Sequence, residues 1–279
     1  DLHLLSRRQR QMCIRDRGLT GCFLFTSCRS AQETTARYEI SKVEGNMITI
    51  DSTWNANPDK KATTVLKPYK DKVDAMMYEV IGTSEMKMDK GTPESLLSNL
   101  VASVLQEAAA QVLGKPADMG LVNMGGLRNI LPKGDITVGA VFEILPFENS
   151  LCVLTMKGTD MKRLFKAIAS LHGEGVSGIR LEINKKGELL NATIGGKPVV
   201  DDQLYTVATI DYLADGNGRM DAFLQAEKRV CPEDATLRGL FLDYVRKQTA
   251  EGKAITSKLD GRITCLLYTS PSPRDPKTS

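Results

Sequence analysis

Residues 92–114, TPESLLSNLVASVLQEAAAQVLG, constrain the fold more than any other stretch of the sequence. Apolar residues recur there at spacings of three and four, the period of a helix that buries one face. Thr92 suits the N-cap, Pro93 the first helical position and Gly114 the position just beyond the end. The pattern predicts a helix over residues 92–113 with this buried face: Leu96, Leu97, Leu100, Val101, Val104, Leu105 and Ala108.

Helical and extended patterns are mixed along the rest of the chain. Further helices are predicted over residues 66–81 (with Tyr69, Val73, Met76, Met77 and Val80 on a core-facing side), over 137–145 capped by Thr137, from Thr159 or Asp160 to His172, and over 232–250. Strands are predicted as two short segments within 38–51, at 119–122, from Leu151, in a hairpin that turns at 185–187, and from Leu204. Because hairpins accompany the helices, the pattern favours an α+β fold with mixed sheets.

The two ends do not continue these patterns. Residues 1–17 and 266–279 have neither helical nor strand period and resemble translated sequencing-adapter DNA, so they are excluded from the fold. Residues 18–27 resemble the stump of a bacterial lipoprotein signal, with Cys28 as the lipidated residue and 28–37 as a linker. The alternative is an apolar segment joined by accident. The domain itself is expected to span residues 38–265, held in the cell envelope (periplasm or outer membrane) and touching a membrane only through that lipid anchor.

Charge and cysteine content exclude several classes of protein. The chain carries a net charge of +3, but its terminal segments are basic and residues 18–265 are close to neutral, which argues against a nucleic-acid partner. Six cysteines are present without a CxxC spacing, so neither a zinc site nor a disulfide framework is predicted.

The stretch NMGGLRN, residues 123–129, follows the predicted strand at 119–122. Gly125 and Gly126 permit positive φ and close approach of the backbone to a ligand. Arg128 offers a planar donor fork that suits a phosphate or a carboxylate. By spacing and composition alone the stretch reads first as a surface turn, and a tight turn is also the first reading of ADGNG at 214–218.

A hydrolytic centre is not predicted in this chain. A site with two metal ions needs several histidine and carboxylate ligands, and the sequence has two histidines, one of them in the excluded first segment. A G-x-S-x-G nucleophile motif is also missing. We therefore expect no catalytic residue, no metal ligand and no cofactor here.

Three stretches together resemble a known family. SNLVASVL, NMGGLRNILPKGDITVGAVFEILPFENSL and LYTVATIDYLADGNGRMDAF follow one another, within residues 93–263, as in the C-terminal domain of the 5'-nucleotidase and UDP-sugar hydrolase family. The resemblance implies a four-layer α/β/β/α core. It also implies that the domain binds the nucleoside part of a substrate and helps to hold its phosphate, while an N-terminal domain with two metal ions performs the hydrolysis.

Individual residues take their expected roles from this resemblance. Asn123 and Arg128 match the residues that face phosphate and sugar, with the two glycines between them in a ligand-contacting loop. Phe147 and Tyr212 match the two aromatics between which the base stacks; the alternative is that both rings serve packing.

Two departures from the family pattern stand out. Gly218 occupies the place of an aspartate that binds the ribose hydroxyls, and Asp215 is the candidate substitute. An arginine that often precedes the helix at 92–113 is absent, with only Lys87 and Lys90 nearby.

These observations lead to one expected function and two alternatives. The expected function is nucleotide or nucleoside recognition in nucleotide catabolism, on behalf of a separately encoded metallophosphatase that alone carries divalent metals. The chain by itself would then lack 5'-nucleotidase activity. The alternatives are an envelope lipoprotein that binds nucleosides or nucleotides without any enzymatic role, and a relic domain that has lost its ligand.

Overall fold

A computed structural model of the chain describes residues 40–266, and Cys28 lies outside them. The chain divides into two units at Asn57. In the first unit the described part holds one short helix, η1 (Ser52–Ala56), capped by Asp51. The two strands expected within residues 38–51 are a wrong prediction for the described residues 40–51, which form neither strand nor helix and are exposed. A strand needs a partner for its backbone groups, and none of the described strands pairs with this segment.

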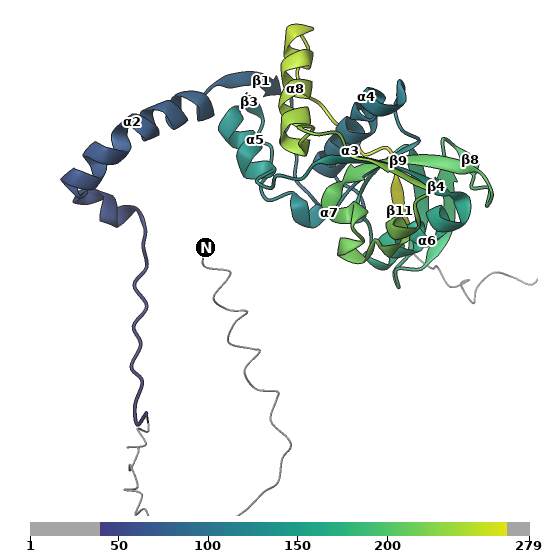
Figure 1. The fold of residues 1–279 in the computed structure, drawn as a ribbon, viewed down its shortest axis with the longest axis horizontal. Coiled ribbons are helices and arrows are strands. Elements are labelled where there is room, and N and C mark those ends of the chain that lie inside the picture. The colour runs from purple at the N-terminus through teal and green to yellow at the C-terminus, as the bar shows by residue number, and fades with distance from the viewer. Residues whose placement is uncertain (1–39, 267–279) are drawn as a thin grey trace, which may run out of the picture. The chain divides into compact units, whose positions relative to one another are not determined.

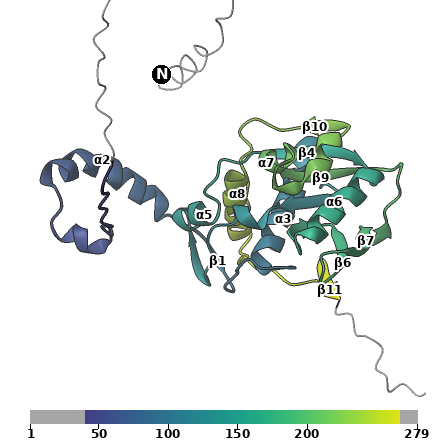
Figure 2. The same ribbon diagram turned by 90° about the horizontal axis from the view of Figure 1, so that it is seen from below.

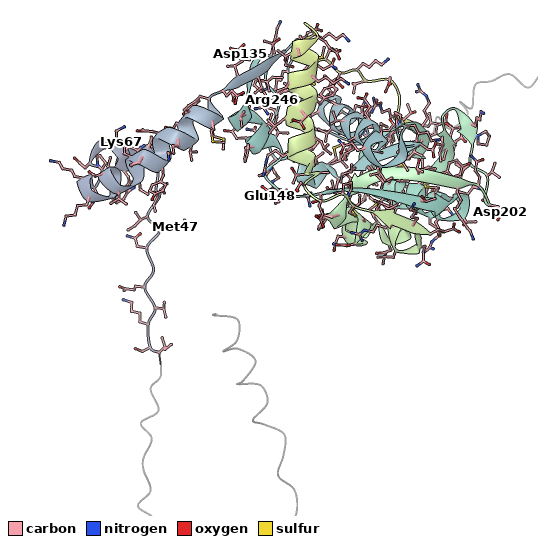
Figure 3. All side chains as sticks on the ribbon, turned by 45° about the horizontal axis from the view of Figure 1, so that its top comes forward. Met47, Lys67, Asp135, Glu148, Asp202 and Arg246 are labelled. Carbon is pink, nitrogen blue, oxygen red and sulfur yellow. A yellow bond between two sulfur atoms is a disulfide. The ribbon has the colours of Figure 1, made fainter. Side chains whose placement is uncertain are left out.

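The second unit begins with a long exposed helix, α2 (Lys60–Met77), followed by β1 (Val80–Ser84) (Figures 1 and 2). α2 starts six residues before the predicted helix, because Asp59 caps it by accepting from the Ala62 amide at 2.8 Å. The expected burial of its apolar side is wrong: Tyr69 is 70% exposed and Met76 is 64% exposed. Only the end of α2 is covered, where it contacts α5. Lys67 on this helix is exposed and pairs with Asp71 (Figure 3).

Eleven strands in the described residues form three sheets. The five-stranded sheet has the order β10-β4-β9-β2-β5, the four-stranded sheet β11-β6-β7-β8, and β1 pairs with β3. β2 and β9 are parallel, as are β6 and β11, and all other named pairs are antiparallel. The remaining bounds are β2 Met119–Val122, β3 Gly134–Thr137, β4 Leu151–Lys157, β5 Gly175–Ser177, β6 Ile179–Asn184, β7 Leu189–Ile194, β8 Lys197–Pro198, β9 Leu204–Ile210, β10 Lys228–Val230 and β11 Ile263–Leu266.

Helices cover these sheets. They are α3 Leu96–Ala108, α4 Ala110–Leu113, α5 Val138–Ile144, α6 Gly158–Ser170, α7 Asp211–Ala214 and α8 Leu237–Ala250, with the 3-10 helices η2 Met124–Gly126, η3 Asn217–Arg219 and η4 Asp221–Gln225. α3 packs on β2, β5 and β9, whereas α6 contacts strands of both larger sheets. The mixed sheets and the helices packed on them confirm the predicted α+β class (Figure 1).

The helix predicted at 92–113 exists, with a different start and a break. Ser95 caps α3 instead of Thr92, and the peptide bond between Thr92 and Pro93 is cis. Ala109 separates α3 from α4, and Gly114 lies just beyond the end of α4, as predicted. Gly114 is in the left-handed conformation. Five of the seven residues on the predicted face are buried, and Leu96 and Ala108 are partly buried. The window Leu96–Leu113 is apolar enough to cross a membrane, but half of it is buried inside the domain, as in a core helix.

Of the other predicted helix starts, one is correct and two are wrong. Thr137 caps α5, its hydroxyl accepting from the Ala140 amide at 3.1 Å, as predicted. Neither Thr159 nor Asp160 caps α6, because that helix already begins at Gly158. α8 begins at Leu237 and is capped by Thr236, five residues later than the predicted start.

A disulfide joins Cys152 on β4 to Cys231, just after β10, and corrects the expectation of none. The two residues lie 79 positions apart in the sequence, so their spacing carried no signal. They meet because β10 pairs with β4 at the edge of the five-stranded sheet. Among the described cysteines, Cys265 is unpaired.

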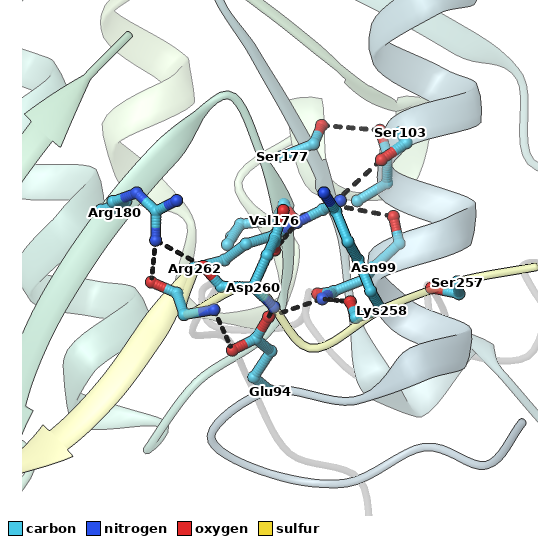
Figure 4. A network of polar contacts seen from close by, with 12 residues as sticks. Glu94, Asn99, Ser103, Val176, Ser177, Arg180, Ser257, Lys258, Asp260 and Arg262 are labelled. Atoms are coloured by element: carbon cyan, nitrogen blue, oxygen red, sulfur yellow. Dashed lines mark hydrogen bonds and ion pairs between the residues drawn. The ribbon is translucent and has the colours of Figure 1, made fainter. Parts of the chain in front are cut away.

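A polar network fastens the C-terminal segment to α3 and β5 (Figure 4). The Arg262 guanidinium donates to the Asn99 carbonyl at 2.9 Å, the Ser103 hydroxyl at 3.0 Å and the Val176 carbonyl at 2.8 Å. Glu94, just before α3, accepts from the Asp260 and Gly261 amides. These bonds hold the chain in place as it enters β11.

Candidate functional site

A cavity of about 340 Å³ opens at one edge of the five-stranded sheet, and three separate segments line it. Because β2 and β9 are parallel neighbours, the residues that follow them emerge at the same edge. The first residue of β4 pairs with the last residue of β9, so the connection from α5 to β4 reaches this edge too. The lining consists of Asn123, Gly125, Gly126, Phe147, Asn149 and Tyr212.

Five of these six residues were singled out in the sequence as candidate ligand contacts, and the structure brings them around one cavity. Phe147 is 49% exposed and Tyr212 is 45% exposed, so neither ring is buried in the core. Half-exposed aromatic side chains beside a concave surface are typical of sites that bind flat apolar groups.

The loop after β2 is built tightly around the Asn123 side chain. A Cβ at Gly126 would lie 3.0 Å from Asn123 Oδ1, so a larger residue would displace that side chain. Neither Gly125 nor Gly126 has the positive φ that a glycine permits. Close approach, not backbone handedness, explains the glycine at 126.

Asn123 presents an unused acceptor. Its Oδ1 is buried and has no hydrogen-bond partner. It is the only buried side-chain nitrogen or oxygen in the described residues that lacks one. Such an atom costs free energy unless a ligand or a water satisfies it. Asn123 is one of the residues that line the cavity, and its Oδ1 lies beneath that lining, out of contact with solvent.

Two titratable side chains, Glu174 and Lys90, hydrogen-bond to the backbone of this loop. The Met124 amide donates to the Glu174 carboxylate, and partial burial raises the pKa of Glu174 to about 6. Lys90 Nζ donates to the Leu127 carbonyl at 2.5 Å and contacts the Met124 carbonyl at 3.5 Å. Glu174 was not anticipated from the sequence, since it lies fifty residues from its partner and no motif contains it.

Arg128 directly follows the loop and contacts Phe147, but it is not among the residues that line the cavity. Its guanidinium carbon is 6.0 Å from the centre of the Phe147 ring, and Nη1 donates to the Gly125 carbonyl at 3.3 Å. Its backbone amide donates to the Ile144 carbonyl at 2.9 Å, which ties the loop to the end of α5. The exposed guanidinium keeps further N–H groups that can bind an anion.

Asp215 is not part of the cavity lining. Its carboxylate accepts from Arg229 Nη1 at 2.6 Å, on the side of β10. Gly218 has a φ of +66°, a conformation in which any residue with a side chain would be strained.

The polar residue of the cavity lining that sequence reasoning missed is Asn149, whose side-chain amide donates to Asp211 at 3.0 Å. Its only sequence signal is its place two residues after Phe147.

Among residues 40–266, no three His, Cys, Asp or Glu side chains lie close enough together to hold a metal ion. The described site therefore offers aromatic faces, amide groups and one arginine. These groups can bind and orient a molecule.

A domain of mixed sheets, with an aromatic-lined cavity where two parallel strands end, has the architecture of a small-molecule-binding domain. The model of the 5'-nucleotidase C-terminal domain family matches residues 79–225. The chain belongs to this family.

Three known proteins show the range of the similarity. The trifunctional nucleotide phosphoesterase protein YfkN of Bacillus subtilis is 27% identical over 240 residues, covering 78% of this chain and 16% of that protein. The cell wall protein Lmo0130 of Listeria monocytogenes is 27% identical over 258 residues, covering 81% of this chain and 32% of that protein. The crystal structure of a 5'-nucleotidase precursor from Thermus thermophilus superimposes with a TM-score of 0.63 at 27% identity, covering 76% of this chain and 44% of that one. The chain thus spans less than half the length of each.

Proposed function

We propose that this chain recognises a nucleotide or nucleoside for a 5'-nucleotidase-type hydrolase. The observation that carries the proposal is the pair of half-exposed rings, Phe147 and Tyr212, lining one cavity with the Asn123–Gly126 loop. The base lies against the rings, where stacking is favourable for any base. In this proposal Arg128, beside Phe147, and Asn123, in the cavity lining, bind the phosphate and sugar part.

We further propose that hydrolysis takes place on a separate metallophosphatase that carries two metal ions. The exposed apolar side of α2 supports a protein partner: Val65, Leu66, Tyr69, Val73 and Met76 are each more than half exposed. An apolar stripe of this length on one helix is costly in water and is typical of an interface. In this proposal the partner phosphatase covers α2.

The proposed location is the cell envelope. The Cys152–Cys231 disulfide supports it, because disulfides persist in oxidising compartments. One relative is named a cell wall protein, which agrees with this location. Lipidation at Cys28 would supply the membrane anchor, and it is tested by mass spectrometry of the protein made in a bacterial host.

The binding proposal is tested by calorimetry of the full chain with adenosine, AMP and UDP-glucose, without divalent metal. We expect saturable binding that Arg128→Ala weakens most for the ligands that carry phosphate. Arg246→Ala is the matched control, since Arg246 is an exposed arginine on α8, ion-paired with Glu79. Absence of binding by the unmodified chain at millimolar ligand would contradict the proposal.

The partner proposal is tested by isolating the tagged chain from a native envelope extract and assaying AMP hydrolysis with and without a chelator. We expect metal-dependent hydrolysis that is lost when Tyr69→Asp disrupts the apolar side of α2. If the chain binds nucleotide but neither carries nor stimulates a phosphatase, its role is binding alone.

A further inference from the structure

Arg238, at the start of α8, is 7% exposed and makes an unusual set of contacts for a buried charge. Its Nη1 donates to the Leu145 carbonyl at 3.1 Å and to the Pro146 carbonyl at 3.2 Å. Its Nη2 donates to the Glu148 carboxylate, and its guanidinium lies 4.0 Å from the centre of the Phe142 ring. A planar fork with several donors can satisfy all these groups at once.

The acceptors of Arg238 lie on both sides of Phe147 in the sequence. Two are the carbonyls that precede it, and the third is the side chain that follows it. The same stretch is also fastened to the start of α8 by backbone bonds. Leu237 donates to the Asn149 carbonyl at 2.8 Å, and Leu151 donates to the Ala235 carbonyl at 2.8 Å.

Phe147 lies in a segment that Arg238 contacts, and its own side chain remains half-exposed. Phe147 is 49% exposed and lines the cavity, while Arg238 hydrogen-bonds to the two carbonyls that precede it and to the Glu148 side chain. A ring that is already in place does not lose conformational entropy when a ligand stacks on it. Arg238 is not among the residues that line the cavity, so any effect on a ligand passes through this segment.

We propose that Arg238 is a positioning residue, which fixes segment 145–149 and thereby holds Phe147 ready to stack on the base. The proposal rests on the proposed function for its effect on ligand binding, but its effect on the segment is independent of any ligand.

The first measurement compares full-length Arg238→Met and Arg238→Lys with the unmodified chain. Met retains a long apolar stem against Phe142 and loses all donors, whereas Lys retains the charge and loses the fork. We expect Arg238→Met to weaken AMP binding about tenfold and Arg238→Lys to weaken it less, with ribose 5-phosphate binding unchanged for both. A merely structural defect would weaken both ligands alike. Phe147→Ala combined with Arg238→Met should weaken AMP binding no more than Phe147→Ala alone.

The second measurement is amide hydrogen exchange without ligand. We expect faster exchange at residues 147–151 in Arg238→Met, with the exchange of β9 unchanged. Arg246→Met is the matched control, since Arg246 lies on the same helix and pairs only with Glu79. Unchanged exchange in Arg238→Met overturns the positioning role, as does a variant with faster exchange that binds AMP normally. If the unmodified chain binds no AMP, the proposed function fails, and the exchange result alone decides whether Arg238 positions the segment.

Discussion

Arg229 donates to the carboxylate of Asp215 across 2.6 Å and thereby turns Asp215 toward β10, away from the residues that line the cavity. Asp215 was the candidate replacement for a ribose-binding aspartate. The ion pair gives Asp215 a different role: it connects the segment that follows Tyr212 to β10, the strand just before Cys231 of the disulfide.

Asp215→Asn is therefore expected to leave nucleoside affinity nearly unchanged. Both partners of the ion pair are more than one-third exposed, and such pairs contribute about 0–1 kcal/mol to stability. Calorimetry with adenosine and 2'-deoxyadenosine is the measurement. A tenfold loss for adenosine alone would return Asp215 to ribose binding and contradict this expectation.

Tyr212→Ala and Phe147→Ala are each expected to weaken binding of a base-carrying ligand. Loss of one stacking face costs about 1–3 kcal/mol, or roughly fivefold to 150-fold in affinity. Tyr212→Phe should retain most of the affinity, because the ring face is kept. Tyr69→Ala is the control, as Tyr69 is an exposed aromatic on α2 outside the cavity lining. Equal effects of Tyr69→Ala and Tyr212→Ala would argue against stacking.

Stability is expected to fall as pH rises from about 4.5 to about 6, through Glu174. Burial raises the folded-state pKa of this carboxyl from 4.5 to about 6, so the folded protein binds the proton more tightly than the unfolded chain does. The folded state therefore gains stability at low pH and loses it as Glu174 ionises, on the order of 1 kcal/mol after discounting for partial exposure. The measurement is chemical unfolding at a series of pH values.

Glu174→Gln should remove that part of the pH dependence, because glutamine keeps an acceptor for the Met124 amide and does not ionise. Glu233→Gln, at an exposed position, is the control and should leave the pH dependence as it is. The same slope in Glu174→Gln as in the unmodified chain would show that another group titrates.

Reduction of the Cys152–Cys231 disulfide is expected to lower the free energy of unfolding by about 2–5 kcal/mol, since the bond closes a long loop. Denaturant unfolding with and without dithiothreitol measures the loss. The double variant Cys152→Ala, Cys231→Ala should be less stable than the oxidised chain and insensitive to the reductant. If reductant shifts the double variant as much, other cysteines are responsible.

Much of the fold followed from local patterns. The buried face of α3, the cap at Thr137 and the helix end at Gly114 were all predicted correctly, because each depends on neighbours within one or two helical turns. The prediction that α2 buries its apolar side was wrong for a non-local reason. Its period is genuinely amphipathic, but the period does not tell whether another element covers it, and in the described chain it is exposed.

The sequence by itself determined the α+β class, most helix and strand positions and, through motif resemblance, five of the six residues around the cavity. Tertiary structure alone decided how they are held. Cys231 reaches Cys152, Glu174 reaches Met124 and Arg238 reaches the Phe147 segment from 50 to 93 residues away in the chain. It also paired Asp215 with Arg229. Sheet pairing and helix packing create such contacts, and the spacing of residues in the sequence does not predict them.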